Sequence, residues 1–202
     1  YGVSVPSINS SYSYKYFGTG RGISAYTFID EYSRVFYDTV ISSSEREAAY
    51  VLDGLLYNEV VESTIHSTDT HGYTEVVFGV SNSLGVEFAP RIKSPGNQIM
   101  YSFRNMPQKY YREKGYKIIP EKGRYINEEI LNEQWDNILR FLASIKTKKV
   151  TASVIMKRLS SYSKNHPLYK ALKELGRVYK TIFLLKYFDD SEYRQRIEKQ
   201  LN

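Results

Sequence analysis

Apolar and polar positions follow two different periods along the first part of the chain. Alternating, β-branched or aromatic positions predict strands at residues 2–5, 23–29, 35–41, 61–68 and 86–92. Apolar positions three and four residues apart predict two helices, at residues 44–56 and 73–84. The chain therefore begins as three strands, a helix, a strand, a helix and a further strand.

The residues between these segments indicate how the strands connect. The polar stretch 30–34 is a turn that makes the second and third predicted strands an antiparallel hairpin. Ser44 and Glu47 have the spacing of a capping box, and Gly85 is a natural end for the second helix. The pattern thus predicts three meandering strands, followed by parallel strands that are linked through helices. By analogy, this order matches an α/β fold with a ribonuclease H-like mixed sheet.

The second part of the chain has a different pattern. Residues 97–126 lack a clear period and predict an irregular or short-stranded segment. Helical periods follow at 127–145 and 151–159, and a longer helix begins at Pro167. The first of these helices has an apolar side that carries Ile130, Leu131, Trp135, Ile138, Leu139 and Leu142.

A final helix is expected after Asp189 or Asp190, one of which caps it. No apolar run approaches the roughly 18 residues of a membrane span, and nothing resembles a signal peptide. The chain has no cysteine, which excludes disulfides, a thiolate nucleophile and Cys-ligated zinc.

Charge is distributed unevenly between the two halves of the chain. Residues 1–100 carry 6 Lys/Arg and 11 Asp/Glu, whereas residues 101–202 carry 22 and 11. The basic half suits a polyanion such as nucleic acid, although a solvated basic surface without a partner is the alternative. Four cations of the long helix are expected on a face different from its apolar stripe: Lys170, Lys173, Arg177 and Lys180.

Asp69 is the strongest candidate for chemistry. It is predicted at the carboxyl end of a parallel strand and just before a helix, where open α/β sheets place their sites. A carboxylate there is a hard oxygen ligand suited to Mg²⁺ or Mn²⁺. From the pattern alone, an Asp that merely caps the following helix is an equal alternative.

Other motifs carry weaker signals. The glycine-rich run 18–22 has neither P-loop nor dinucleotide-binding spacing and is better explained as a flexible approach to a strand. His66, His71 and His166 lack metal-site spacing, although His71 is close enough in sequence to Asp69 to contact a substrate. Asp53 could line the sheet, but a solvent-facing or paired acid is the simpler interpretation.

Several motifs resemble one known family along essentially the whole chain and in the same order. They are KYFGTGRG at 15–22, YVLDGLL at 50–56, TDTHGYTE at 68–75, FAPRIK at 88–93 and the region from 168 to 202. These motifs resemble the replicative transposases of the Tn-three family, which belong to class II transposons. The resemblance implies an Asp-Asp-Glu catalytic domain of ribonuclease H-like fold, with a largely helical insertion before the helix that bears the Glu.

The resemblance also implies a division of this chain. Residues 1–93 would be the ribonuclease H-like core with an incomplete first strand, 94–187 the basic, mostly helical insertion, and 188–202 the start of the final core helix. Asp69 matches the second Asp of the triad. The first Asp is expected upstream of the chain and the Glu just downstream of it. This interior part of the catalytic domain is therefore expected to be inactive alone.

Neither Glu192 nor Glu198 matches the family Glu. In the intact enzyme, the resemblance implies three carboxylates that hold two Mg²⁺ (or Mn²⁺) ions, with Asp69 as the metal ligand and catalytic residue of this part. The implied reactions are metal-dependent DNA strand cleavage at transposon ends and strand transfer into target DNA. Predicted phosphate contacts, inferred from charge, are Arg91, Lys93, Lys170, Lys173, Arg177 and Lys180.

The expected partners are DNA, as transposon terminal repeats and target DNA, and further copies of the chain in a homo-oligomeric active complex. No membrane is expected, and the location would be the bacterial cytoplasm at the nucleoid. Two alternatives stay open. The chain could be a non-catalytic DNA-binding or assembly fragment, or a stand-alone ribonuclease H-like nuclease such as a junction resolvase, which would need a complete set of acids.

Overall fold

The computed structural model describes residues 1–3, 7, 10–12, 14, 18–30, 32–42, 48–57, 65–68, 73–161 and 166–200. Its strands are β1 (Gly2–Val3), β2 (Ser11–Tyr12), β3 (Arg21–Ile29), β4 (Val35–Ser42), β5 (Ile65–His66) and β6 (Glu87–Phe88). Its α-helices are α2 (Ala48–Tyr57), α3 (Glu75–Ser83), α4 (Gln108–Glu113), α5 (Glu128–Glu133), α6 (Trp135–Lys146), α7 (Ala152–Ser161), α8 (Pro167–Asp189) and α9 (Ser191–Gln200), and η1 (Pro95–Asn97) is a 3-10 turn. The chain is mixed α/β, as predicted.

The β3–β4 hairpin is confirmed. The two strands pair antiparallel from Ile23 opposite Ser42 to Ile29 opposite Val35, and β1 and β2 add to the other end of β3. The turn is held by Asp30, whose Oδ1 accepts hydrogen bonds from the backbone N–H of residues 32 and 34, each at 2.9 Å. An Asp side chain that satisfies turn N–H groups in this way fixes the register of the hairpin.

The second expected pairing, between parallel strands, is also confirmed. Strand β5 pairs with β6 so that His66 lies opposite Phe88. The backbone contact continues past both strands, because Ala89 N–H donates to His66 O at 2.8 Å and Arg91 N–H donates to Thr68 O at 2.7 Å. Helix α3 makes the connection from β5 to β6, as expected of a crossover-linked parallel pair.

Helix α3 begins and ends with clear signals in the sequence. Thr74 is its N-cap, with Oγ1 accepting from Val77 N–H at 3.4 Å. At the other end Gly85 has a φ of +92°, a left-handed conformation that glycine adopts at little cost. The predicted capping box of the preceding helix, Ser44 and Glu47, lies outside the described residues.

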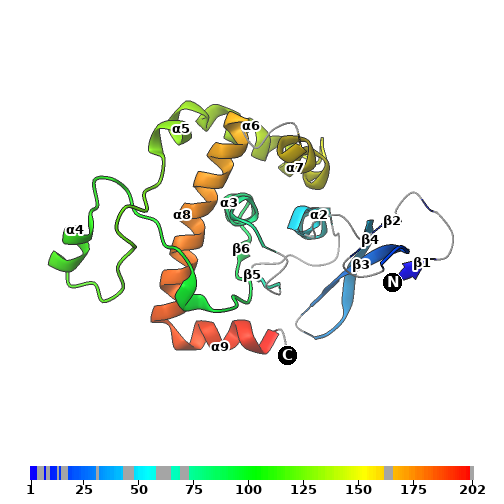
Figure 1. Ribbon diagram of the computed structural model, residues 1–202, viewed down its shortest axis with the longest axis horizontal. Coiled ribbons are helices and arrows are strands. Elements are labelled where there is room, and N and C mark those ends of the chain that lie inside the picture. Colours follow the sequence, from blue (N-terminus) through cyan, green and yellow to red (C-terminus); the bar gives the residue numbers. More distant parts are fainter. Residues whose placement is uncertain are drawn as a thin grey trace.

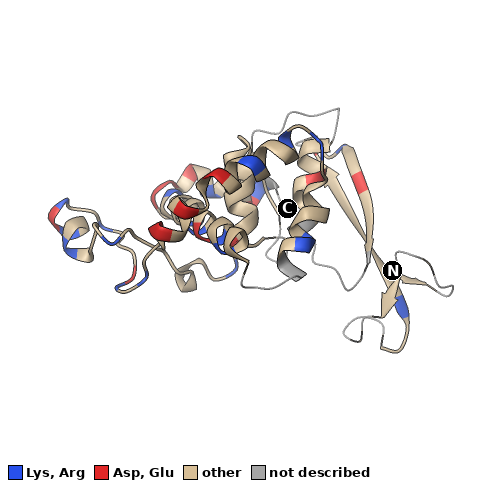
Figure 2. Ribbon diagram, turned by 90° about the horizontal axis from the view of Figure 1, so that it is seen from above, with Lys and Arg blue, Asp and Glu red and all other residues tan. Residues whose placement is uncertain are grey.

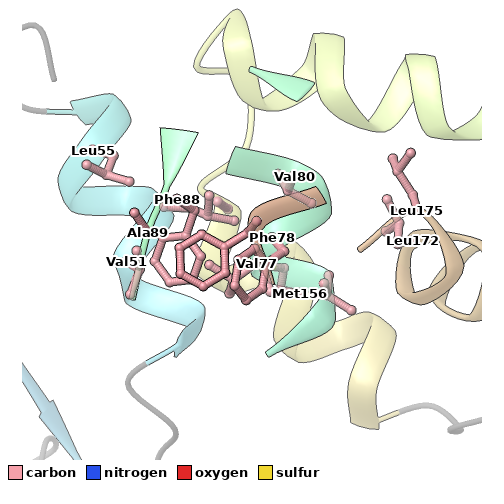
Figure 3. Close-up of a cluster of buried hydrophobic side chains, with 14 of the residues drawn as sticks. Val51, Leu55, Val77, Phe78, Val80, Phe88, Ala89, Met156, Leu172 and Leu175 are labelled. Atoms are coloured by element: carbon pink, nitrogen blue, oxygen red, sulfur yellow. The ribbon is translucent and has the colours of Figure 1, made fainter. Parts of the chain in front are cut away.

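One hydrophobic core joins the two halves of the chain (Figures 1 and 3). Helices α2 and α3 and strand β6 supply residues from the first half, and α7 and α8 supply residues from the second. Burying each large apolar side chain stabilises the fold by about 1.5–3 kcal/mol. The buried residues labelled in Figure 3 are Val51, Leu55, Val77, Phe78, Val80, Phe88, Ala89, Met156, Leu172 and Leu175.

Helices α3 and α8 approach each other backbone to backbone. A Cβ placed on Gly79 would lie 2.9 Å from the backbone N of Gly176. A Cβ on Gly176 would lie 1.6 Å from the carbonyl oxygen of Glu75. Only residues without a side chain fit at this crossing, so two glycines set how closely α8 packs on α3.

The predicted helix over 127–145 is instead two helices, α5 and α6, with a break at Gln134. The break changes which positions face the core. Trp135 and Leu139, expected on the apolar side, are 48% and 47% exposed. The buried positions of α6 are Ile138, Phe141 and Ile145.

The last two helices follow the prediction. Helix α8 begins at Pro167 in its first turn. Of the two candidate caps for the final helix, Asp190 is the one used, because its Oδ1 accepts from Tyr193 N–H at 2.9 Å. Within the described ranges, no helix combines the length and apolar character that crossing a bilayer requires.

Candidate active site

The candidate site lies where the parallel strands β5 and β6 end. Asp69 itself, with residues 70–72, lies outside the described residues. Its neighbour in the sequence, Thr68, is buried and receives the hydrogen bond from Arg91 N–H that ties the carboxyl ends of the two strands together. The described structure therefore fixes the last residue before Asp69 at the edge where open α/β sheets place their ligands.

Tyr73, the next described residue, leads into α3. Its ring packs edge-on against Phe78, with centroids 5.9 Å apart, and its hydroxyl donates to Gln98 Oε1 at 3.4 Å. The Lys180 Nζ lies 5.7 Å from the centroid of the same ring. The described residues that follow residue 72 are thus held by α3, by the segment after η1 and by α8.

A buried cation lies beside the first turn of α3. Lys180 is only 9% exposed, and burial lowers its pKa, an effect that the nearby negative charge of Glu75 opposes. Burial, and secondarily the charge of Glu75, raises the pKa of the Tyr73 hydroxyl. The N-terminus of a helix is itself partly positive, so Lys180 and the first turn of α3 together favour negative charge near this end.

His66 belongs to the packing of the sheet. Its ring stacks on Phe28 of β3 and on Phe88 of β6, at centroid distances of 5.4 and 6.1 Å. Its Nε2 is buried and has no hydrogen-bond partner among the described residues. Burial lowers the pKa of His66 to about 4, so the ring is neutral at physiological pH.

Helix α9 is docked against the same region. The hydroxyl of Tyr193 donates to Glu87 Oε1 at 3.1 Å, which joins α9 to the start of β6. The hydroxyl of Tyr187 donates to Glu198 Oε1 at 3.5 Å. Burial raises the pKa of this hydroxyl, and the positive charges of Arg194 and Arg91 oppose that shift. The last described helix is therefore fixed beside the parallel pair.

The described residues do not by themselves form a metal centre. Over the ranges given above, no three His, Asp or Glu side chains come close enough together to hold an ion. His166 is exposed at the start of α8, and His71 lies outside the described residues.

Comparison with known proteins identifies the family. Residues 1–202 match the family described as the Tn3 transposase DDE domain. The transposase for transposon Tn2501 of Escherichia coli is 40% identical over 187 residues, which is 92% of this chain and 18% of that protein. This chain belongs to the Tn3 transposase DDE domain family.

Two further relatives of this DDE domain agree. The transposase for transposon Tn1546 of Enterococcus faecium is 36% identical over 188 residues, 93% of this chain and 18% of that protein. The transposase for transposon gamma-delta of Escherichia coli (strain K12) is 34% identical over 200 residues, 98% of this chain and 19% of that protein. The chain thus spans about a fifth of the length of the curated relatives it matches.

The structure of this DDE domain separates the cations predicted on one face of the long helix. Lys170 is exposed and Lys173 is half-buried. Arg177 forms an ion pair with Glu174 and lies over the ring of Tyr101, 4.7 Å from its centroid. Lys180 is buried against α3, as described above. The four side chains therefore do not share one exposed basic face, because Lys180 lies on the side of α8 that packs against α3.

The other predicted cations lie close to the strand edge. Arg91 and Lys93 are both exposed and follow β6, one on each side of the buried Ile92. This alternation is typical of an extended chain that keeps one side on the core. Their positions allow contact with a ligand at the carboxyl edge of the parallel strands.

Asp53 has a structural role that the sequence left open. It is 5% exposed, and its Oδ1 accepts a hydrogen bond from Ser153 N–H at 3.0 Å. The carboxylate on α2 thus caps the N-terminus of α7, so the solvent-facing interpretation is wrong, and the partner that the structure gives this acid is a backbone N–H. Sequence reasoning missed the role of Gly176, whose signal was a glycine inside an otherwise regular helix.

Proposed function

We propose that this chain is an interior part of the catalytic domain of a DNA transposase. The intact protein would cleave DNA strands at transposon ends and transfer them into target DNA. The observation that carries the proposal is the hydrogen bond between Arg91 and Thr68, which joins the carboxyl ends of two parallel strands directly before Asp69. The relatives that cover this chain are themselves transposases, which supports the same reaction class.

Asp69 is proposed as a metal ligand and catalytic residue of the intact enzyme. The alternative, that it only caps the following helix, loses support because Thr74 already caps α3. Mg²⁺ and Mn²⁺ are the proposed ions, since a carboxylate is a hard oxygen ligand. Such ions, when bound, stabilise the charge that develops on oxygen during phosphoryl transfer. The two other acids of the triad are proposed to lie outside this chain.

A ribonuclease H-like sheet is proposed as the full architecture. The antiparallel meander around β3 and the parallel pair β5–β6 are the two parts that such a sheet combines. The ring of His66, stacked on both Phe28 and Phe88, supports a position of β5 between β3 and β6, because ring distances of 5.4 and 6.1 Å suit neighbouring strands.

The division into core (1–93), insertion (94–187) and start of the last helix (188–202) also stays a proposal. Helix α8 belongs to the proposed insertion by its position in the sequence. It nevertheless packs directly on α3, and buried residues of both helices belong to the same hydrophobic core. An insertion that contributes to the core in this way would help to position the proposed catalytic edge at the ends of β5 and β6.

DNA is the proposed substrate and partner, as terminal repeats and as target. Of the six cations predicted to contact phosphate, exposed Arg91, Lys93 and Lys170 and half-buried Lys173 are the best placed to do so. The same role for Arg177 and Lys180 stays a prediction that their described contacts do not support. A homo-oligomeric active complex and action at the bacterial nucleoid are proposed from the family alone.

The metal requirement separates this function from its rivals. Labelled terminal-repeat DNA would be incubated with the intact transposase that contains this chain, with Mg²⁺, with Mn²⁺ or with EDTA. Cleavage that requires the ion is expected. Salt-sensitive binding without cleavage in any condition would instead favour a DNA-binding or assembly module. Metal-dependent nicking by residues 1–202 alone would favour a stand-alone nuclease.

A further inference from the structure

Residues 101–126, named here the arm, leave the core and return to it. Figure 1 shows α4 at the far end of this excursion, projecting away from α8 and the other helices. Both ends are fixed to α8, because Tyr101 N–H donates to Thr181 Oγ1 at 2.9 Å and Asn127 N–H donates to Glu174 Oε2 at 3.1 Å. A backbone hydrogen bond from Ser102 N–H to Arg124 O, 3.0 Å long, closes the base of the arm.

The arm is strongly basic, and Lys and Arg positions recur along its ribbon in Figure 2. All of its Lys and Arg side chains are exposed: Arg104, Lys109, Arg112, Lys114, Lys117, Lys122 and Arg124. The arm has only two acids, and each pairs within it, Glu113 with Lys109 at 3.6 Å and Glu121 with Arg124 at 3.7 Å. Within the described residues no ion pair joins the other five cations to a carboxylate.

Packing inside the arm fixes the backbone that carries these cations. The rings of Tyr110 and Tyr111 meet edge to face at 5.5 Å, and those of Tyr111 and Tyr116 at 6.2 Å. Gln108 Nε2 donates to the carbonyl of Pro120 at 3.1 Å, which ties α4 to the segment of the arm that returns to the core. A charged surface that is ordered before binding loses less conformational entropy when it binds.

We propose that the arm is a second DNA-contacting surface, which binds the phosphate backbone of duplex DNA away from the catalytic edge. The inference rests on the proposed function for its substrate, DNA. Charge complementarity selects a polyanion, since unpaired cations outnumber free acids on this surface and each duplex phosphate carries a negative charge. An acidic surface on a second copy of the chain is the rival occupant.

The test compares two variants of the 202-residue chain that each lose four exposed cations. The arm variant carries Arg112→Gln, Lys114→Gln, Lys117→Gln and Lys122→Gln. The matched control removes cations elsewhere, with Arg140→Gln, Lys146→Gln, Lys149→Gln and Lys199→Gln. Binding to labelled duplex DNA, with terminal-repeat or unrelated sequence, would be measured by fluorescence anisotropy in EDTA over a range of salt concentrations.

We expect the arm variant to bind both duplexes at least about tenfold more weakly, and its salt slope to fall by about 0.9 for each phosphate that the arm no longer neutralises. The control should change affinity by no more than about twofold, because its charges lie off the proposed surface. Equal losses in the two variants would overturn the proposal. Unchanged DNA binding in the arm variant would also overturn it. If sedimentation then showed that this variant no longer self-associates, the arm would instead contact a second copy of the chain.

An Asp69→Asn variant of the intact transposase keeps this result separate from the catalytic proposal. Normal DNA binding by the arm variant, together with loss of cleavage in Asp69→Asn, would overturn the arm proposal alone. Weak binding by the arm variant, together with full cleavage in Asp69→Asn, would support the arm and contradict the catalytic role. Unfolding of the arm variant is checked by its circular dichroism spectrum, which we expect to match that of the control.

Discussion

Gly176 of α8 lies against the carbonyl oxygen of Glu75, the first residue of α3, so closely that a Cβ on the glycine would be 1.6 Å from that oxygen. The contact joins a helix from the basic half of the chain to the first turn that follows the Asp69 segment. The position of this first turn of α3 therefore depends on α8. The proposed catalytic edge is supported from a region that the family resemblance assigns to an insertion.

Substitution Gly176→Ala tests this support. The added methyl group meets backbone atoms that cannot rotate away, so one helix must shift. We expect a loss of about 3 kcal/mol in the free energy of unfolding, measured by urea denaturation, because overpacking a tight contact costs about 1–3 kcal/mol or more. Gly96→Ala is the control, since a Cβ there meets nothing within 4 Å. Equal stability of the two variants would show that α8 does not constrain α3.

Asp53 is expected to stabilise the fold through its bond to Ser153. In Asp53→Ala the buried N–H of Ser153 loses its acceptor, which costs about 1–3 kcal/mol. Asp53→Asn keeps an oxygen acceptor and should lose distinctly less. Exposed Asp189→Ala serves as a control with little effect. The ranking is read from urea midpoints, and an Asn variant as unstable as the Ala variant would contradict the capping role.

His66 predicts a pH dependence of stability. The folded state holds its pKa at about 4, below the usual value of 6.5, so between these values the unfolded chain binds the proton more readily. Stability from this group is complete above pH 6.5 and is lost as the pH falls towards 4. Because the unfolded chain takes up the His66 proton first, the free energy of unfolding should fall by about 2 kcal/mol between pH 7 and pH 5.

The measurement is urea unfolding at pH 7 and pH 5. In His66→Phe, which keeps an aromatic ring between Phe28 and Phe88, we expect the difference between the two pH values to shrink by about 2 kcal/mol. Exposed His166→Gln should leave the wild-type difference unchanged. A His66→Phe variant with the full wild-type pH dependence would refute the assignment.

Local features of the fold could be predicted because they depend on neighbouring residues. The hairpin followed from the β-branched runs around Asp30, and the start of α8 followed from Pro167. The break at Gln134 was missed because the apolar spacing on either side is compatible with one continuous helix. A helical period shows which positions share a face only as long as the helix continues. Where the chain changes direction between two helices, a different set of positions faces the core.

Long-range contacts could not be predicted from the pattern. Asp53 and Ser153 are 100 residues apart in sequence, and nothing in either segment specifies that one caps the helix of the other. Lys180 shares a helical charge pattern with Lys170, yet it is buried because its side of α8 meets Tyr73 and Glu75. The proposed role of Asp69 came from the family resemblance, since its position in the sequence pattern allowed a helix cap equally well.

The most direct test of the account is metal-dependent DNA cleavage by Asp69→Asn in the intact transposase that contains this chain. Loss of a metal-binding carboxylate should lower the rate of terminal-repeat cleavage with Mg²⁺ or Mn²⁺ by more than about a thousandfold. Binding of the same DNA should persist, and Asp189→Asn, made at an exposed acid, should cleave normally. Cleavage by Asp69→Asn at the wild-type rate would contradict the central claim.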